Sequence, residues 1–439
     1  MAYSALFYVM KSLGTQSEWM YRLPSLLAVG AAAFALFRMT CRMFGRDAAW
    51  MATAAFVSFD TVRFAADDAR PYAIALFFAV LASDLLLRFL DKPGYGMAVS
   101  YGLASAAMLH FQILFGALLV AHGAFAVYRM ARGEAVRAPH WFAALAALGA
   151  GALPLALQYL KFTASAGAHS FAAAPSRTEW AISFMPATWV CVAMLVAAAC
   201  LVGRGVAIEV RGEREAGMFA LLWALTPPIV LFGISVFTPA RVFVPRYLLS
   251  YSPGMAMCFG AIAGSLKPRV IRAAAMCVMA LLAVVSMGAP TSFRHTVGLG
   301  DWGAAIRFID ANAARDGATV LIRSQYVESD AMPLEPPIDN GNFSQVAFYP
   351  LRAASIPLAN RFTPKEAARV DAFLRSEAVR RTGRFLVAMF HGPAPEEPLL
   401  YFIRGRLGLN CVIRELANFD GISVTEFVLG GQVPVGRCP

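Results

Sequence analysis

Residues 141–160 read WFAALAALGAGALPLALQYL, an unbroken run without a charged side chain. A helix rises about 1.5 Å per residue, so this run is long enough to cross the hydrocarbon core of a bilayer, which is about 30 Å thick. A soluble fold would have to bury such runs, yet 59% of the 439 residues are hydrophobic and only 15% are charged. The run therefore predicts a membrane-spanning helix.

Similar runs recur between Pro24 and Pro290 and then stop. They predict a mainly α protein, a polytopic membrane helix bundle of about nine to ten spans over residues 1–290, followed by a small soluble α/β domain over residues 291–439. The predicted spans cover residues 24–40, 47–62, 71–90, 96–109, 111–128, 141–160, 181–202, 217–236, 246–265 and 271–289. Tyr95–Met130 is long for one helix and short for two, so His110 marks either a tight turn or a broken span.

Clusters of basic residues predict the orientation of the bundle. If Tyr95–Met130 crosses twice, the clusters fall in every second connection between spans, and the positive-inside rule places those connections in the cytoplasm. The soluble domain is then extracytoplasmic. The clusters are Arg38/Arg42/Arg46, Arg88/Lys92, Arg129/Arg132/Arg137, Arg204/Arg211/Arg214 and Lys267/Arg269/Arg272.

The region after Pro290 alternates helix and strand patterns. Residues 301–317 and 363–383 have helical periodicity, with Thr363 as the expected N-cap of the second helix. Residues 318–323 and 384–390 read as strands, and residues 411–429 as a hairpin that turns at Asp420-Gly421. The region contains no GxGxxG, P-loop, GxSxG or HExxH motif, so we expect a cover or an acceptor-recognition domain rather than the catalyst.

Composition excludes several classes of protein. The formal net charge of +11 comes from short clusters between apolar spans, which argues against nucleic-acid binding. The seven cysteines show no metal-ligand spacing, so no metal site and no cofactor is predicted, although a divalent metal is not ruled out. Cys411 and Cys438 belong to the soluble region and could pair in an oxidising compartment.

Charged side chains at the predicted outer ends of the spans are the candidates for function, because such groups are costly near hydrocarbon. The stretch FAADDARPYA (64–73) places Asp67, Asp68, Arg70 and Tyr72 where a span begins. These acids either cap the helix, with Arg70 as a local counter-ion, or bind an acceptor beside a phosphate group held by Arg70 and Tyr72.

Three further positions lie on the same predicted side. His110, in LHFQ, is either a structural hydrogen-bond donor or a catalytic group. Arg241 and Arg246, in RVFVPRY, either bind phosphate or reach the lipid headgroups, and Tyr247 follows Arg246. The connection 161–179, which contains Lys161, His169, Arg177 and Glu179, is either a mobile lid or a connector.

The order and spacing of several short sequence segments resemble those of the C-type integral membrane glycosyltransferases. The resemblance is to the branch of the protein O-mannosyltransferases, aminoarabinose transferases and lipopolysaccharide-core sugar transferases. The resemblance runs through nearly the whole chain. It is carried by LFYVMKSLGTQSEWMYRLPSLL (6–27), FGRDAAWMATAAFVSFD (44–60), DDARPYAIALFF (67–78), His110-Phe111, PRYLLSYSP (245–253) and DWGAAIRFIDANAARDGATVLIR (301–323).

The resemblance implies a glycosyltransferase that moves a sugar from a polyprenyl phosphate to a lipid, glycan or protein acceptor outside the cytoplasm. It implies that Asp68, with Asp67 as the alternative, lines the catalytic site. Arg70 and Arg246, with Arg241, are the implied ligands of the donor phosphate, and Tyr72, His110 and Tyr247 are supporting polar groups.

One feature of the family is missing from this sequence. Family members carry an acidic residue, the expected general base, in an outer loop after an initial span, whereas this sequence begins just beyond that point. We therefore expect the physiological chain to start further upstream. The alternative functions are a polytopic transporter or flippase, which predicts polar residues at mid-span and an internal repeat, and a noncatalytic truncated homologue.

Overall fold

The computed structural model divides the chain into two compact units, Met1–His295 and Thr296–Pro439. The residues that the structure describes are 18–68, 70–134, 136–162, 174–183, 207–208, 214–267, 269–288, 301–313, 316–324, 349, 351–390, 397–408 and 411–430.

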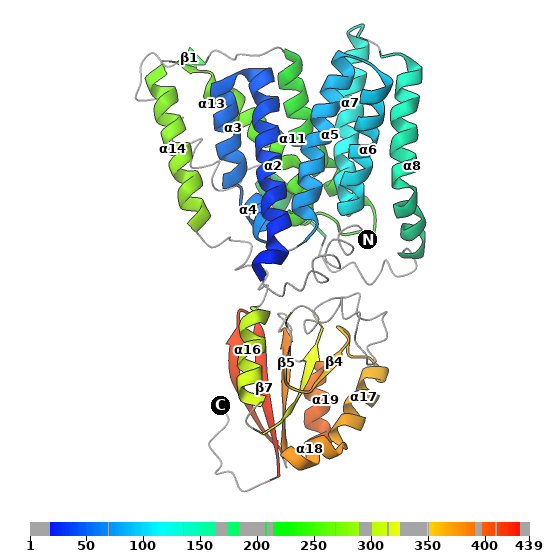
Figure 1. Ribbon diagram of the computed structural model, residues 1–439, viewed down its shortest axis with the longest axis vertical. Coiled ribbons are helices and arrows are strands. Elements are labelled where there is room, and N and C mark those ends of the chain that lie inside the picture. Colours follow the sequence, from blue (N-terminus) through cyan, green and yellow to red (C-terminus); the bar gives the residue numbers. More distant parts are fainter. Residues whose placement is uncertain are drawn as a thin grey trace. The chain divides into compact units, whose positions relative to one another are not determined.

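The first unit is a bundle of long helices that lie side by side (Figure 1). Among the described residues, five helical stretches are long and apolar enough to cross a membrane: Arg22–Phe44, Tyr72–Asp91, Ile113–Ala131, Ala138–Leu157 and Arg214–Phe237. The helices are α2 (Glu18–Phe44), α3 (Arg46–Ser58), α4 (Asp60–Asp67), α5 (Tyr72–Asp91), α6 (Tyr95–Phe111), α7 (Ala117–Ala131), α8 (Ala138–Phe162), α9 (Arg177–Ser183), α11 (Arg214–Phe237), α12 (Pro245–Leu248), α13 (Ser252–Gly264) and α14 (Arg269–Gly288). The predicted polytopic membrane bundle is confirmed.

Glycines allow the helices to approach one another closely. A Cβ on Gly102 of α6 would lie 2.3 Å from the carbonyl oxygen of Ala144 in α8, and one on Gly260 of α13 would lie 2.4 Å from that of Ala48 in α3. Without a hydrophobic driving force in lipid, close backbone contact of this kind is a main source of helix association. These glycines therefore fix the packing of α6 on α8 and of α13 on α3.

The structure breaks one predicted span and resolves one ambiguous stretch. The window 47–62 is broken at Phe59, whose extended backbone separates α3 from α4, so the connection predicted after Asp60 begins as a helix. The ambiguous stretch Tyr95–Met130 forms two helices, because α6 ends at Phe111 and the chain continues through the 3₁₀ turn Ile113–Gly116 into α7. Most of the window 181–202 lies outside the described residues.

Four of the five basic clusters lie where α2 meets α3, α5 meets α6, α7 meets α8 and α13 meets α14, whereas Arg204 and Arg211 of the fifth lie outside the described residues. In Figure 1 these junctions are at the upper end of the bundle, and α4 is at the lower end. Several of the arginines are paired with carboxylates there: Arg42 and Arg88 with Asp84, Arg129 with Asp91, and Arg272 with Asp47. The end of the bundle that carries Asp68 is therefore the one opposite the basic clusters.

The second unit contains a five-stranded mixed sheet in the order β4-β3-β5-β7-β6. The strands are β3 (Thr319–Arg323), β4 (Ser355–Leu358), β5 (Arg384–Phe390), β6 (Cys411–Phe419) and β7 (Ile422–Leu429). Strand β3 runs parallel to β4 and β5, whereas β7 runs antiparallel to β5 and β6. The predicted small α/β sheet domain is thus present after the bundle.

Helices cover both faces of this sheet. Helix α16 (Trp302–Ala313) packs on one face, where Ile306 and Ile309 meet Leu386 and Val424. Helices α17 (Pro364–Leu374), α18 (Glu377–Thr382) and α19 (Pro398–Leu407) pack on the other face. The unit has an apolar core on each side of the sheet, which is the arrangement of an independent α/β layer structure.

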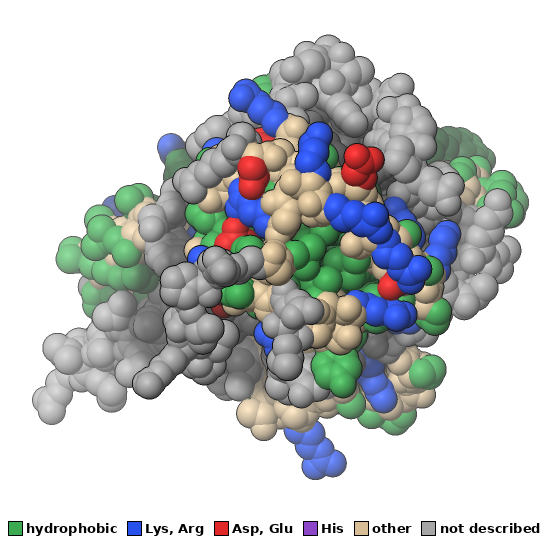
Figure 2. All heavy atoms as spheres, turned by 90° about the horizontal axis from the view of Figure 1, so that it is seen from below, with side chains coloured by type: hydrophobic (Ala, Val, Ile, Leu, Met, Phe, Trp, Pro, Cys, Tyr) green, Lys and Arg blue, Asp and Glu red, His purple; other side chains and the backbone are tan. Residues whose placement is uncertain are grey.

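Charged side chains of both signs lie on the face of the protein that is seen from below. Figure 2 shows Lys and Arg side chains interspersed with Asp, Glu and apolar side chains among the residues that are drawn in colour. The mixture is typical of a solvated surface rather than of one built to attract a single sign of charge.

Candidate active site

A proline produces the turn that carries Asp68. Pro71 has no backbone N–H, and it disfavours the helical region for the residue before it, so α4 cannot continue into α5. Helix α4 ends at Asp67, Asp68 has an extended backbone (φ −89°, ψ 127°), and α5 begins at Tyr72 directly after Pro71. Asp68 therefore stands between the end of one helix and the start of another, at the end of the bundle opposite the basic clusters.

The Asp68 carboxylate is buried and only partly compensated. Its side chain is 18% exposed, Nε of Arg70 lies 3.4 Å from Oδ2, and Oδ2 accepts no hydrogen bond from the described residues. Burial raises the pKa of Asp68 above its ordinary value, and the nearby charge of Asp67 raises it further. Arg70, Arg246 and Arg22 oppose this shift. A carboxylate in such a place is suited to accept a proton or a hydrogen bond from a ligand.

Helix α12 brings a second group of polar side chains to Asp68. Arg246 acts electrostatically on both Asp68 and Tyr72. Its guanidinium lies over the ring of Tyr247, 5.1 Å from the centroid, and Nη2 donates to the Tyr247 hydroxyl at 3.4 Å. The rings of Tyr72 and Tyr247 are 6.4 Å apart. The structure therefore brings together five predicted site residues from two segments far apart in the sequence.

Asp67 has a different partner from Asp68. Nη1 of Arg22, in the first turns of α2, donates to Oδ1 of Asp67 at 2.8 Å. The hydroxyl of Ser25, one helical turn further on, donates to the backbone carbonyl of Asp68 at 2.9 Å. Neither Arg22 nor Ser25 was predicted as a site residue. Arg22 is a charged residue at the edge of an apolar run, within the segment 6–27 that carries part of the family resemblance.

Two of the predicted site residues have structural partners. Nε2 of His110 lies 2.7 Å from the carbonyl oxygen of Gly151, so the ring links α6 to α8. The Arg241 guanidinium donates to the carbonyl oxygens of Ser235 and Thr238, at the C-terminal end of α11. Both side chains satisfy backbone carbonyls where the structure places them, and their roles toward a donor stay predictions.

A buried polar cluster that the sequence analysis missed lies inside the bundle. His122 of α7 is 1% exposed. Its Nε2 lies 3.0 Å from the Ser83 hydroxyl of α5, and its Nδ1 lies 3.2 Å from the Tyr101 hydroxyl of α6. Because both ring nitrogens have partners on neighbouring helices, the cluster joins α5, α6 and α7.

No metal centre is evident in the described part of the chain, which contains no group of three or more His, Cys, Asp or Glu side chains that could hold an ion. Cys411 is a free thiol there, and its predicted partner Cys438 lies outside the described residues. In the connection 161–179, a reciprocal pair of hydrogen bonds between Ser176 and Glu179 caps α9, at 2.6 and 3.1 Å, whereas His169 is not described.

The site thus combines one buried carboxylate with cations and phenolic hydroxyl groups at the end of a membrane bundle. Guanidinium groups bind phosphate oxygens well, because their N–H donors match the geometry of an anion with several oxygens. A carboxylate next to them can bind a hydroxyl or amine that attacks a group on that phosphate. The arrangement suits group transfer from an amphiphilic phosphate.

Comparison with known proteins yields only structural relatives. No protein-family model and no curated protein matches the sequence. The structure resembles ArnT from Cupriavidus metallidurans bound to undecaprenyl phosphate, with a TM-score of 0.58 and 15% sequence identity, over 95% of this chain and 86% of that one. It also resembles the apo state of the same protein, with a TM-score of 0.56 and 14% identity, over 95% and 85% of the two chains. The chain therefore has the fold of the ArnT glycosyltransferases, as the resemblance in its sequence predicted.

Proposed function

We propose that the protein is a membrane glycosyltransferase that takes a sugar from a polyprenyl-phosphate donor and passes it to an acceptor outside the cytoplasm. The observation that carries the proposal is the cluster of Asp68, Arg70 and Arg246 at one end of the bundle. The fold supports it, because a protein of the same fold binds undecaprenyl phosphate.

The proposed reaction is a displacement at the anomeric carbon of the donor. A hydroxyl or amine of the acceptor attacks this carbon, the bond between the carbon and the phosphate oxygen breaks, and the polyprenyl phosphate leaves with the bonding electron pair. The acceptor loses a proton to a carboxylate or to water. Fixed positive charge near the phosphate stabilises the negative charge that develops on the leaving oxygen.

The residues of the cluster divide these tasks. Arg70 and Arg246 hold the donor phosphate, and Tyr72 and Tyr247 orient it through their hydroxyl groups. Asp68 binds the nucleophile of the acceptor through its carboxylate. Arg241, between α11 and α12, and His110, near the end of α6, complete the outer end of the site through the segments that they hold in place.

The location follows from the same proposal. The end of the bundle with Asp68 faces away from the cytoplasm, since the basic clusters lie at the other end. The protein lies in the inner (plasma) membrane of a bacterium, and the soluble unit after α14 belongs to the outer side of that membrane. The acceptor of the sugar is a lipid, a glycan or a protein.

The His122 cluster could instead favour a transporter, since polar groups inside a bundle often mark a translocation path. Its geometry argues against that reading. Both ring nitrogens of His122 have a partner, and the side chain is 1% exposed, so the cluster offers no open polar group to a passing solute.

A transfer assay tests the proposal. The purified protein, in nanodiscs, receives undecaprenyl-phosphate-linked sugars and a panel of lipid, glycan and peptide acceptors, and mass spectrometry detects the product. We expect transfer by the wild type and by Arg38→Gln, which is altered at the opposite end of α2, and strongly reduced transfer by Asp68→Asn. Transfer by Asp68→Asn at the wild-type rate would remove the proposed site, and no consumption of any donor by the wild type would remove the proposed function.

A further inference from the structure

We propose that Arg22 and Ser25 of α2 are positioning residues that hold Asp67 and Asp68 so that only Asp68 is presented to the ligands. The proposal rests on the proposed function. It adds two residues to the site and assigns different roles to the two adjacent aspartates. Neither residue touches a reacting atom in this account.

The first observation is that α2 contacts both aspartates through two side chains in consecutive turns, on the same face of the helix. Residues three apart on a helix lie on the same side. Arg22 binds the carboxylate of Asp67 at 2.8 Å, and Ser25 binds the main chain of Asp68 at 2.9 Å. The two contacts bridge 45 and 43 residues of sequence. Helix α2 therefore fixes the short connection between α4 and α5 at two points.

The second observation is the direction of the Ser25 hydrogen bond. Ser25 is fully buried, and a buried serine in a helix commonly satisfies its hydroxyl on its own helix, four residues back. Here the hydroxyl donates to another segment. The carbonyl of Asp68 also accepts the N–H of Arg70 at 2.8 Å. With two donors on its carbonyl, the main chain of Asp68 is held, and the direction of its side chain is restricted with it.

The third observation is the balance of charge around Asp68. The charged groups that act on it are Arg70, Arg246, Arg22 and Asp67, and the phenols of Tyr72 and Tyr247 stand beside them. Arg22 and Asp67 act on Asp68 with opposite signs, and they neutralise one another as a pair. Asp67 is thereby occupied, and Asp68 keeps an oxygen without a hydrogen bond among the described residues.

A matched set of variants of the full chain tests this proposal in nanodiscs. The set comprises Arg22→Met, Arg22→Lys, Ser25→Ala, Asp67→Asn and the double variant Arg22→Met/Asp67→Asn. Arg38→Met is the control for loss of an arginine from α2. Ser265→Ala is the control for loss of a buried hydroxyl, because Ser265 donates to Ala261 within its own helix at 2.5 Å.

We expect Arg22→Met and Ser25→Ala to lower kcat by roughly 10- to 100-fold with little change in KM for the donor, because a misplaced catalytic group slows the chemical step. Arg22→Lys recovers part of this loss. The acidic limb of the pH profile moves to higher pH in Arg22→Met and to lower pH in Asp67→Asn, and the double variant returns toward the wild type. A merely structural role would not produce opposite shifts.

A second measurement does not depend on turnover. The difference in Tm between wild type and Asp68→Asn, followed against pH, reports the titration of Asp68 in the folded protein, and Arg22→Met should shift its midpoint upward. If kcat and this midpoint both stay unchanged in Arg22→Met and Ser25→Ala, the positioning role is wrong. If the midpoint shifts while the wild type transfers no sugar, the positioning is correct and the proposed function is wrong.

Discussion

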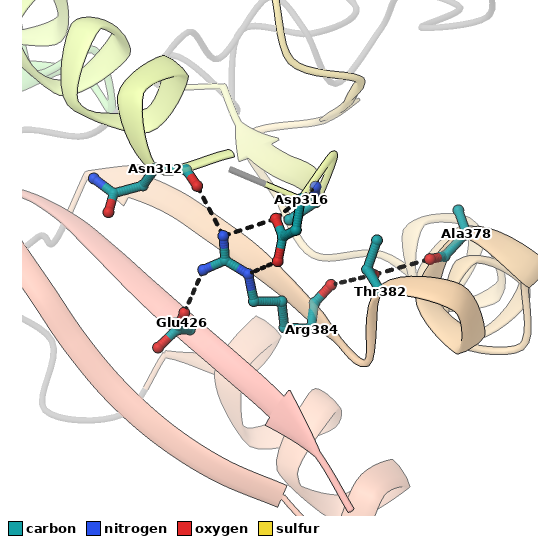
Figure 3. A network of polar contacts seen from close by, with 7 residues as sticks. Asn312, Asp316, Ala378, Thr382, Arg384 and Glu426 are labelled. Atoms are coloured by element: carbon teal, nitrogen blue, oxygen red, sulfur yellow. Dashed lines mark hydrogen bonds and ion pairs between the residues drawn. The ribbon is translucent and has the colours of Figure 1, made fainter. Parts of the chain in front are cut away.

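Arg384 of the soluble unit and Asp68 of the bundle are both largely shielded from solvent, yet their surroundings differ. Arg384 binds Asp316, Glu426 at 2.6 Å and the carbonyl oxygen of Asn312 at 2.8 Å, so its guanidinium is enclosed by acceptors (Figure 3). Asp68 has one arginine at 3.4 Å, and its Oδ2 lacks a hydrogen bond among the described residues.

The carboxylates at the two places, Asp316 and Asp68, titrate in opposite senses. The hydrogen bonds and charge of Arg384 lower the pKa of Asp316, whereas burial raises the pKa of Asp68. A buried charge with all its hydrogen-bond and ion-pair partners stabilises the fold, whereas a buried charge with too few partners lowers the stability of the fold that holds it. Arg384 thus belongs to a structural network in the soluble unit, whereas Asp68 belongs to the proposed binding site in the bundle.

The largest effect is expected from Asp68→Asn. Loss of a positioned carboxylate should lower the transfer rate by roughly 10²- to 10⁴-fold. Stability should be unchanged or slightly higher, because the amide is neutral and has nearly the same shape. Turnover and Tm measured on one preparation check both parts. A large loss of Tm would instead place Asp68 in the same class as Arg384.

Arg384→Met should instead lower the stability of the protein more than its transfer rate. Removal of the guanidinium leaves Glu426 and Asp316 without their shared partner between β5, β7 and the end of α16, at a cost of about 2–4 kcal/mol in unfolding free energy. Thermal unfolding of the soluble unit within the full chain is the measurement, with Arg414→Met on the exposed edge strand β6 as control. Equal stability of the two variants would show that the network contributes little.

A smaller effect is expected from the N-cap of α17. The Thr363 hydroxyl accepts the N–H of Glu366 at 3.4 Å, as the sequence predicted. Thr363→Ala should lower the unfolding free energy by about 1 kcal/mol, whereas Thr363→Ser should keep most of it. Chemical denaturation measures the difference, and a Ser variant as unstable as the Ala variant would exclude a capping role.

The smallest effect, and the most specific, concerns pH. Asp316 has a lowered pKa, so its contribution to stability is present above the unfolded pKa and is lost as pH falls through the folded one. Asp68 has a raised pKa, so its contribution is present at low pH and is lost as pH rises through the folded one. Tm differences between wild type and the two Asp→Asn variants should therefore change with pH in opposite directions, and curves of the same sign would contradict the comparison.

Local patterns predicted much of the fold. The hairpin of β6 and β7 was predicted from the Asp420-Gly421 pair, which is typical of a two-residue turn. In the structure both residues adopt the positive φ that such a turn requires, at 51° and 91°. Strand β4 and helix α19 were not predicted. Strand β4 has only four residues, including Pro357, and lies at the edge of the sheet, where a proline is tolerated but a strand pattern is hard to recognise.

The site was predicted less completely than the fold. Composition at the start of a span pointed to Asp67, Asp68 and Arg70, but two adjacent aspartates cannot be told apart by sequence alone. The difference comes from Arg22 and Ser25, which lie more than forty residues away in the chain. Contacts of that range depend on how α2 packs against α4 and α5, which no local pattern encodes.

Binding of undecaprenyl phosphate to the purified protein shows whether the cations beside Asp68 hold a lipid phosphate. We expect saturable binding that weakens by about tenfold or more in Arg70→Gln and Arg246→Gln, since each charge-assisted contact contributes about 1.5–3 kcal/mol, and that stays unchanged in Arg38→Gln at the other end of the bundle. Equal affinity of all four proteins would mean that these cations do not hold the phosphate.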